Sequence, residues 1–178
     1  ERPQVPGGGF PPARAGQDPN EVLHVPESTK GFTRAQILNF FDVGDWFPED
    51  HPAPPNVVMR GWAPAVRACG LCHLPNGKGR PENSPVSGQP YSYILQQLQD
   101  FKNDLRSSAD PRKGNTALMI EGAKGMTDEE MRAAAAYFAS IKWTPWIRVV
   151  ERDTVPRTQL IGNVFIPMPE GGTEPIGR

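Results

Sequence analysis

The chain has 178 residues, of which 18 are Gly and 21 are Pro, and its formal net charge is −1. This balance gives no basic surface that would attract nucleic acid or an anionic membrane. No stretch approaches the roughly 18 apolar residues that a membrane-spanning helix needs. Leu, Ile, Val and Phe together number only 37. A core made from them alone would be thin, so either much of the chain is irregular or a non-protein group supplies apolar volume.

Residues 1–60 are predicted to form an irregular, Pro- and Gly-rich N-terminal extension. Clusters of turn formers, such as residues 51–56, break helices and favour extended or turn conformations. One short helix is expected after Thr33, because Thr33 and Gln36 have capping-box spacing and apolar residues follow them. Pro48 would stop any continuation of this helix.

The middle of the chain, residues 61–144, carries helical periodicity and is predicted to be the folded domain. The pattern favours three helices, at 64–71, 90–106 and 127–141. The first is indicated by Pro64 in its first turn and the last by a capping box at Thr127 and Glu130. The intervening stretches 74–89 and 107–126 are predicted to be long loops, which tend to be functional or disordered.

Residues 145–178 return to irregular composition and are predicted to be an extended C-terminal arm. Residues 147–150 have weak strand character. Residues 160–165 fit a small hairpin about a turn at Gly162 and Asn163. An extended tail without a hairpin is the alternative for this part of the chain.

The two cysteines of the chain lie in the pentapeptide Cys69-Gly70-Leu71-Cys72-His73. A structural zinc site would normally need four Cys or His ligands in paired clusters, and the histidines left to complete it, His24 and His51, lie in Pro-containing, irregular sequence. A thioredoxin-like dithiol would need a buried strand before the pair, and none is indicated. A plain disulfide is the simplest alternative, but it gives no reason for the histidine that follows.

Covalent haem attachment accounts for all three residues of this motif. Two thiols one helical turn apart can add to the two vinyl groups of a porphyrin, and His73 can then bind the iron as the proximal ligand. A haem would also supply the apolar volume that the thin core lacks. We therefore predict one haem c, with its iron, attached at Cys69 and Cys72.

The second axial ligand decides the function of such a haem, because a Met thioether suits electron transfer and an open position allows small-ligand chemistry. Met119 lies 46 residues after His73, at a point where the chain returns before the last helix. We predict Met119 as this ligand, with Met126 as the alternative. His24 and His51 come third, because Pro-rich surroundings hold an imidazole ring poorly.

Residues 61–144 resemble the class I c-type cytochromes, small helical carriers of electrons. The resemblance rests on the pentapeptide at 69–73 and on three further segments: Asn-Gly-Lys-Gly-Arg at 76–80, Gln-Gln-Leu at 96–98, and Met119 followed by the helix from Thr127. It implies an all-α class I cytochrome c fold around one covalently bound haem. The flanks on both sides, without a second haem motif, are the departure from the family pattern.

The resemblance also implies roles for individual residues. Pro85 matches the family proline whose carbonyl accepts the proximal imidazole N–H, a bond that orients the ligand. Contacts with the haem edge or propionates are implied for four polar and aromatic residues, namely Arg80, Tyr91, Tyr93 and Gln96.

Three functions follow as hypotheses from this reading. The chain is a one-electron carrier, or an electron-transfer subunit held through its terminal extensions to a dehydrogenase, reductase or oxidase. The alternative is a peroxidase-like haem enzyme with an open distal site. Because haem of this kind is attached outside the bacterial cytoplasm, and because the chain begins at Glu1 without a leader, we expect a periplasmic protein from which a signal peptide has been removed.

Overall fold

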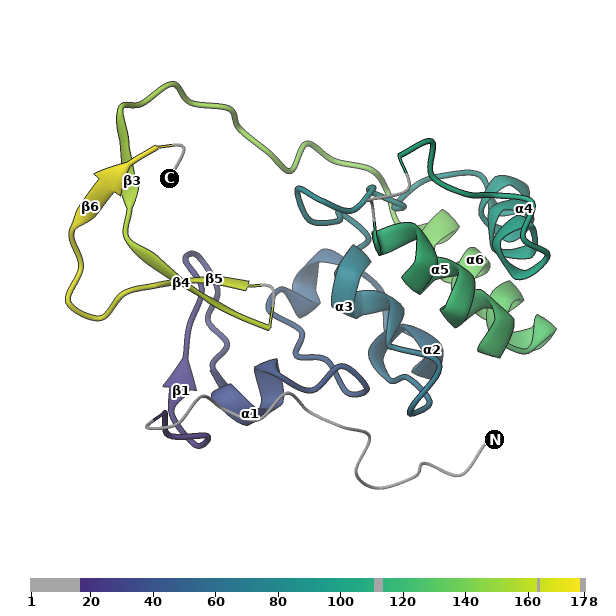
Figure 1. The fold of residues 1–178 in the computed structure, drawn as a ribbon, viewed down its shortest axis with the longest axis horizontal. Coiled ribbons are helices and arrows are strands. Elements are labelled where there is room, and N and C mark those ends of the chain that lie inside the picture. Colours follow the sequence, from purple (N-terminus) through teal and green to yellow (C-terminus); the bar gives the residue numbers. More distant parts are fainter. Residues whose placement is uncertain (1–16, 111–113, 163, 177–178) are drawn as a thin grey trace.

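The computed structural model describes residues 17–110, 114–162 and 164–176. Figure 1 shows the longer helices on one side of the molecule, the strands on the other, and α3 between them. The helices are α1 (Arg34–Ile37), the 3₁₀ helix η1 (Pro48–Asp50), α2 (Asn56–Met59), α3 (Cys69–His73), α4 (Tyr91–Lys102), α5 (Gly114–Gly125) and α6 (Asp128–Ser140). The strands are β1 (Val22–Leu23), β2 (Phe32–Thr33), β3 (Thr154–Pro156), β4 (Thr158–Ile161), β5 (Val164–Pro167) and β6 (Thr173–Pro175).

The helices surround one hydrophobic core, which we call the helical core. Helix α4 packs against α5 and α6, while α2 packs against α3 and α6. The side chains at its centre are almost fully excluded from solvent, Val58 and Ala135 at 0% exposure and Met131 at 1%. Burial of apolar surface on this scale is the main stabilising contribution to such a bundle.

Helix α6 begins where the sequence predicts. Thr127 is its N-cap, and its hydroxyl accepts the backbone N–H of Glu130 while the Glu130 carboxylate accepts the N–H of Thr127. The capping box therefore satisfies two donors that the first turn would otherwise leave without partners.

Helix α4 is also confirmed but is shorter than the predicted 90–106. The Asn103 side chain donates to the Gln99 carbonyl, 2.9 Å away, and Asp104 adopts a left-handed conformation with φ of 57°. The chain therefore leaves the helix before Leu105, which is 76% exposed instead of lying on the buried face.

Two predictions about the middle of the chain are wrong. Residues 64–68 are not helical, because Trp62 and Val66 exchange backbone hydrogen bonds and close a turn around Pro64, so that α3 begins only at Cys69. The expected loop 107–126 contains α5. Its three glycines lower helix propensity, and one of them, Gly125, allows close packing, since a Cβ there would lie 2.5 Å from Val66 Cγ2.

The two flanks form a second hydrophobic cluster, which we call the flank cluster. Its buried members are Leu23 and Ile37 from the N-terminal side and Ile161 and Ile166 from the C-terminal side. Phe32 and Trp46 pack against it and make an edge-to-face pair with centroids 4.6 Å apart. Flanks that were predicted to be extended and irregular therefore share a small core of their own.

The N-terminal flank contains the expected helix, α1, with the capping box of Thr33 and Gln36 in place. It ends at Ile37, and the flank has two further helical turns, η1 and α2, where only one short helix was predicted. Arg34, 3% exposed, is held by an ion pair with Glu21.

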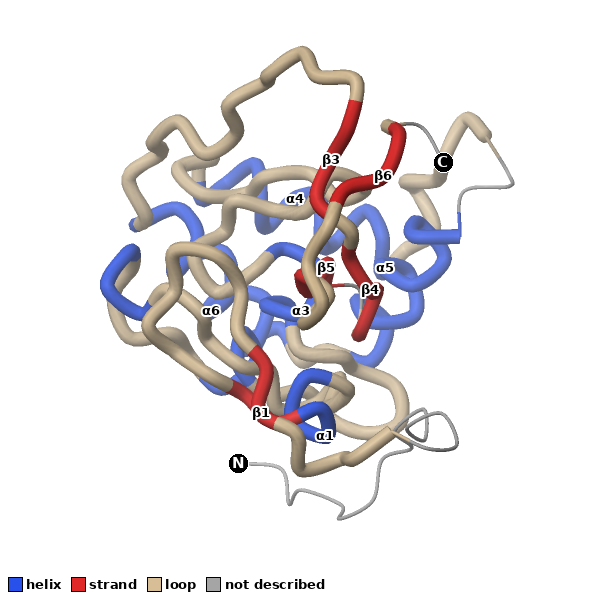
Figure 2. Tube along the Cα trace, turned by 90° about the vertical axis from the view of Figure 1, so that its left-hand side faces the viewer, coloured by secondary structure: helices blue, strands red, loops and turns tan. Residues whose placement is uncertain are grey.

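The C-terminal flank contains the predicted hairpin. Strands β4 and β5 pair antiparallel, with Ile161 opposite Val164. Gly162 in the turn has φ of +52°, and a Cβ there would lie 2.4 Å from the Ile37 carbonyl, so this turn sits directly against α1. Asn163 lies outside the described residues. Residues 147–150 form no strand, while β3 pairs with β6. Figure 2, which looks onto this side, shows the strands in front of the helices.

Candidate haem site

Helix α3 presents the two cysteines one turn apart, and both are free thiols. Gly70 between them allows a close approach to α2, because a Cβ there would lie 2.9 Å from the Val58 carbonyl. Burial raises the pKa of Cys69 to about 12, and burial also raises that of Cys72, with Arg80 and Arg67 opposing it. An activated redox dithiol requires the opposite shift.

His73 closes α3, and its ring orientation is fixed by one hydrogen bond. Nδ1 lies 2.9 Å from the carbonyl oxygen of Ser84. Because a carbonyl only accepts, Nδ1 carries the proton and Nε2 keeps its lone pair for a metal. Burial lowers the pKa of His73, which the bond to Ser84 opposes, so the neutral, metal-binding form is favoured.

The acceptor for this bond corrects one prediction. The carbonyl belongs to Ser84 and not to Pro85, which is the next residue along the chain. The Pro85 ring restricts the residue before it to an extended conformation, so Pro85 acts on the bond through its neighbour. That restriction is the sequence signal from which Ser84 could have been found.

The loop after α3 is folded tightly enough to bring Ser84 back to His73. Gly77 and Gly79 have positive φ, and the Gly79 N–H donates to the His73 carbonyl at 2.8 Å. Lys78 is only 7% exposed, and its ammonium donates to the carbonyl and hydroxyl of Thr144 at 2.8 and 2.6 Å. No local sequence signal marks Lys78 as an anchor, because its partner lies 66 residues away.

The two candidate methionine ligands are placed differently in the helical core, Met126 as a buried member and Met119 packed against it. Met119 lies on α5, partly exposed, and packs against the core. Met126 is 6% exposed and stands directly before the N-cap of α6, the position from which an apolar residue commonly packs against the fourth helical residue, here Met131 of the same core. Met126 therefore already has a packing role, which leaves Met119 as the more available thioether.

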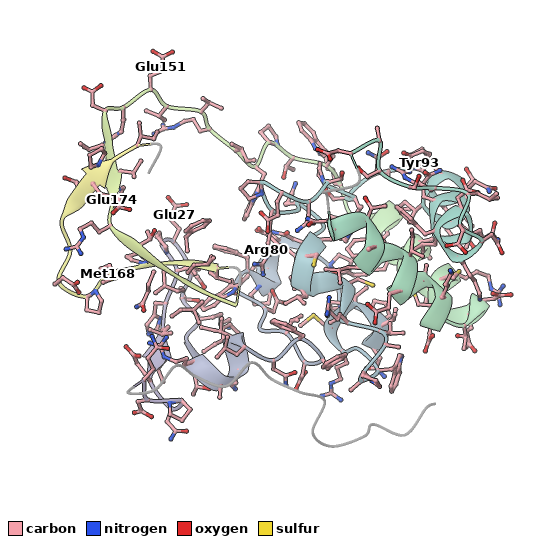
Figure 3. All side chains as sticks on the ribbon, in the orientation of Figure 1. Glu27, Arg80, Tyr93, Glu151, Met168 and Glu174 are labelled. Atoms are coloured by element: carbon pink, nitrogen blue, oxygen red, sulfur yellow. The ribbon has the colours of Figure 1, made fainter. Side chains whose placement is uncertain are left out.

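The other residues predicted to contact the haem fall into two groups, Arg80 near α3 and three residues on α4. Arg80 is beside α3 (Figure 3), and its Nη1 donates to the Gly162 carbonyl at 3.3 Å. Tyr91 and Tyr93 are 40% and 47% exposed on α4, and Gln96 is exposed there with its amide donating to Asp100 at 2.8 Å. The structure thus brings Arg80 to the motif and leaves the α4 residues facing solvent.

The residues present fit a covalently bound haem. Two thiols on one face of α3 precede an imidazole whose Nε2 is unprotonated, and the His73 ring has Phe138 of the core at its edge, with centroids 6.5 Å apart. A zinc site would need four ligands. Among residues 17–110, 114–162 and 164–176, no three His, Cys, Asp or Glu side chains group closely enough to hold a metal ion.

The fold and the site define a helical, haem-attaching domain, and comparison with known proteins agrees. The family model for cytochrome c matches residues 58–142. Cytochrome c-554(548) of Halomonas halodenitrificans is 30% identical over 76 residues, a match that covers 42% of this chain and 86% of that protein. The chain belongs to the cytochrome c family, and the predicted family and helical fold class are confirmed.

Two longer relatives match a similar share of the chain. Cytochrome c4 of Azotobacter vinelandii is 36% identical over 78 residues, covering 43% of this chain and 37% of the relative. A protein named thiosulfate dehydrogenase electron acceptor, from Stutzerimonas stutzeri (strain A1501), is 33% identical over 87 residues, covering 48% of this chain and 38% of the relative. The chain thus matches less than two fifths of the length of either protein. In the described part of the chain, no helix has the length and apolar character needed to cross a bilayer.

Proposed function

We propose that the chain transfers single electrons through one haem c, attached to Cys69 and Cys72, with His73 and Met119 as axial ligands. The observation that carries this proposal is the His73 ring, which is held at Nδ1 by Ser84 and has Nε2 unprotonated, one turn from two thiols. Residues 61–144 are the haem domain in this proposal, and the cytochrome c match at 58–142 supports it.

Each residue of the site has a distinct task. When bound, haem c supplies an iron that cycles between Fe(II) and Fe(III). Cys69 and Cys72 hold the porphyrin to α3, and His73 binds the iron through Nε2. Ser84 keeps the proton on Nδ1 and so fixes the ring's orientation. A thioether from Met119 would occupy the remaining axial position and favour electron transfer over binding of small ligands.

We further propose a redox enzyme as partner, a dehydrogenase, reductase or oxidase in the periplasm. A relative of the haem domain is named as the electron acceptor of a thiosulfate dehydrogenase. The linker between α6 and β3 offers an apolar surface for such contact, since Ile147 and Val149 are 69% and 88% exposed. Purification of the native protein tests this: a partner that co-purifies would show a stable subunit, and its absence a free carrier.

The first test is the mass and spectrum of the purified, exported protein. The expected mass is that of the chain plus one haem, and the expected spectrum is that of six-coordinate His/Met ligation, including the near-infrared sulfur-to-iron band. A colourless protein with the mass of the bare chain would contradict the proposal.

The second test assigns the methionine ligand. Met119→Ala should abolish the near-infrared band while the haem remains covalently attached. Met126→Ala is the matched control, because it removes a similar thioether seven positions away, and it should keep the band. The reverse result would assign Met126, and loss of the band in neither variant would exclude both.

A further inference from the structure

Residues 45–52 of the N-terminal flank are connected by hydrogen bonds to the backbone just after His73, the proposed proximal ligand. The His51 side chain is 1% exposed, and its Nδ1 lies 2.9 Å from the hydroxyl oxygen of Tyr137 on α6. That hydroxyl donates to the carbonyl of Pro75 at 2.8 Å. Pro75 is two residues after His73, so a chain of polar contacts connects the flank to the proximal side of the site.

Counting protons in this chain of contacts fixes the charge of His51. The single Tyr137 hydroxyl proton is used on Pro75, because a carbonyl only accepts. Nδ1 therefore carries a proton, and the Pro52 carbonyl and the Tyr137 oxygen, each 2.9 Å from this nitrogen, share it. On the other side of the ring, Nε2 lies 3.2 and 3.3 Å from the carboxylate oxygens of Asp45, which also only accept.

Both nitrogens of His51 are consequently donors, which makes the ring an imidazolium paired with Asp45. The groups that face it are Asp45 from its own segment, Tyr137 from α6 and the Pro52 carbonyl. Burial, and then the charge of Asp45, raise the pKa of Tyr137. The phenol therefore keeps the proton that it donates to Pro75.

A second contact from the same segment holds the next residue of the loop. The Asn76 amide donates to the Asp50 carboxylate at 3.4 Å, and the Asn76 side-chain oxygen accepts the backbone N–H of Lys78. The flank thus fixes two consecutive residues, Pro75 and Asn76, at the start of the loop that returns Ser84 to His73.

We propose that His51 is a positioning residue for the proximal ligand. As an imidazolium held by Asp45, it keeps Tyr137 on the Pro75 carbonyl and so fixes the backbone from which the His73 ring projects. This inference rests on the proposed role of His73 as iron ligand. It also gives the N-terminal flank a function inside the protein, separate from any contact with a partner.

The charge of His51 can be measured directly. We suggest ¹⁵N NMR of histidine-labelled, reduced holoprotein, with His51→Gln used to assign the His51 signals among the three histidines of the chain. Two protonated ring nitrogens are expected for His51, because each nitrogen faces a group that only accepts. One protonated and one bare nitrogen would overturn the imidazolium.

The positioning role is tested by the reduction potential and by the proximal-histidine signals in the NMR spectrum of the oxidised protein. Tyr137→Phe keeps every charge but removes the hydroxyl, so a change in the His73 signals would report positioning alone. His51→Gln should change the same signals and lower the potential, because loss of a nearby positive charge stabilises the oxidised state. His24→Gln, at an exposed position in the other part of the flank, is the control and should change neither.

Wild-type His73 signals and potential in folded Tyr137→Phe and His51→Gln would overturn the inference and leave the proposed function standing. Should His51→Gln fail to fold, Asp45→Asn provides the same test, because it removes the carboxylate charge that holds the imidazolium. A wild-type protein without covalent haem would instead overturn the proposed function.

Discussion

The helical core and the flank cluster hold together by different means. The helical core is built from helices, with α4 packed against both α5 and α6. The flank cluster joins Leu23 and Ile37 to Ile161 and Ile166, with more than a hundred residues between the two halves. Local sequence pattern therefore identifies much of the first, whereas the second forms only when the two flanks come together.

The largest loss of stability from a single substitution is expected at Phe138, which joins the helical core to the candidate haem site. Phe138 is 3% exposed and contacts both Tyr137 and the His73 ring. Phe138→Ala should cost about 3 to 5 kcal/mol of unfolding free energy through lost burial and the cavity that remains. Denaturant unfolding would measure it, and a cost below 1 kcal/mol would show that the helical core does not depend on this ring.

A smaller and more local effect is expected in the flank cluster. Ile166 is 2% exposed, and Ile166→Ala should cost about 2 to 5 kcal/mol at that site. Because the cluster lies apart from the helical core, hydrogen exchange should accelerate in β4 and β5 while α4 and α6 keep their protection. Equal acceleration in all four elements would mean that the two regions unfold as one unit.

The two capping boxes offer the finest comparison, because the same motif occurs once in each region. Thr127→Ala should lower global stability by about 1 kcal/mol, the usual cost of losing an N-cap. Thr33→Ala removes the same hydroxyl from the four-residue α1 and should loosen only the flank. Unfolding curves and hydrogen exchange of the two variants would show whether the motif carries equal weight in both places.

Much of the helical core could be predicted from the sequence, because the signals are local. The capping box at Thr127 and the spacing of Ile94 and Leu98 identify α6 and α4. Helix α5 was missed because its glycines are typical of loops, yet Gly125 is required by the close approach of Val66. Tertiary packing overrides propensity there.

The sequence predicts the chemistry of the candidate site but not all of the residues that hold its groups in place. The motif from Cys69 to His73 predicts haem attachment on its own, since two thiols and an imidazole at this spacing suit that chemistry. Ser84 follows from the restriction that Pro85 places on it. The anchoring roles of Lys78 and His51 depend on partners far away in the sequence. No periodicity indicates such contacts, so these two roles are seen only in the fold.

The placement of the β4–β5 hairpin has a consequence for the intact molecule. The exposed linker that carries Glu151 (Figure 3) leads to a hairpin whose turn rests on Ile37 and whose Gly162 carbonyl accepts from Arg80. A protease that cuts the linker would break the chain into two fragments that stay associated. The C-terminal piece would remain docked as a non-covalent complement, visible as one species under native conditions and as two after denaturation.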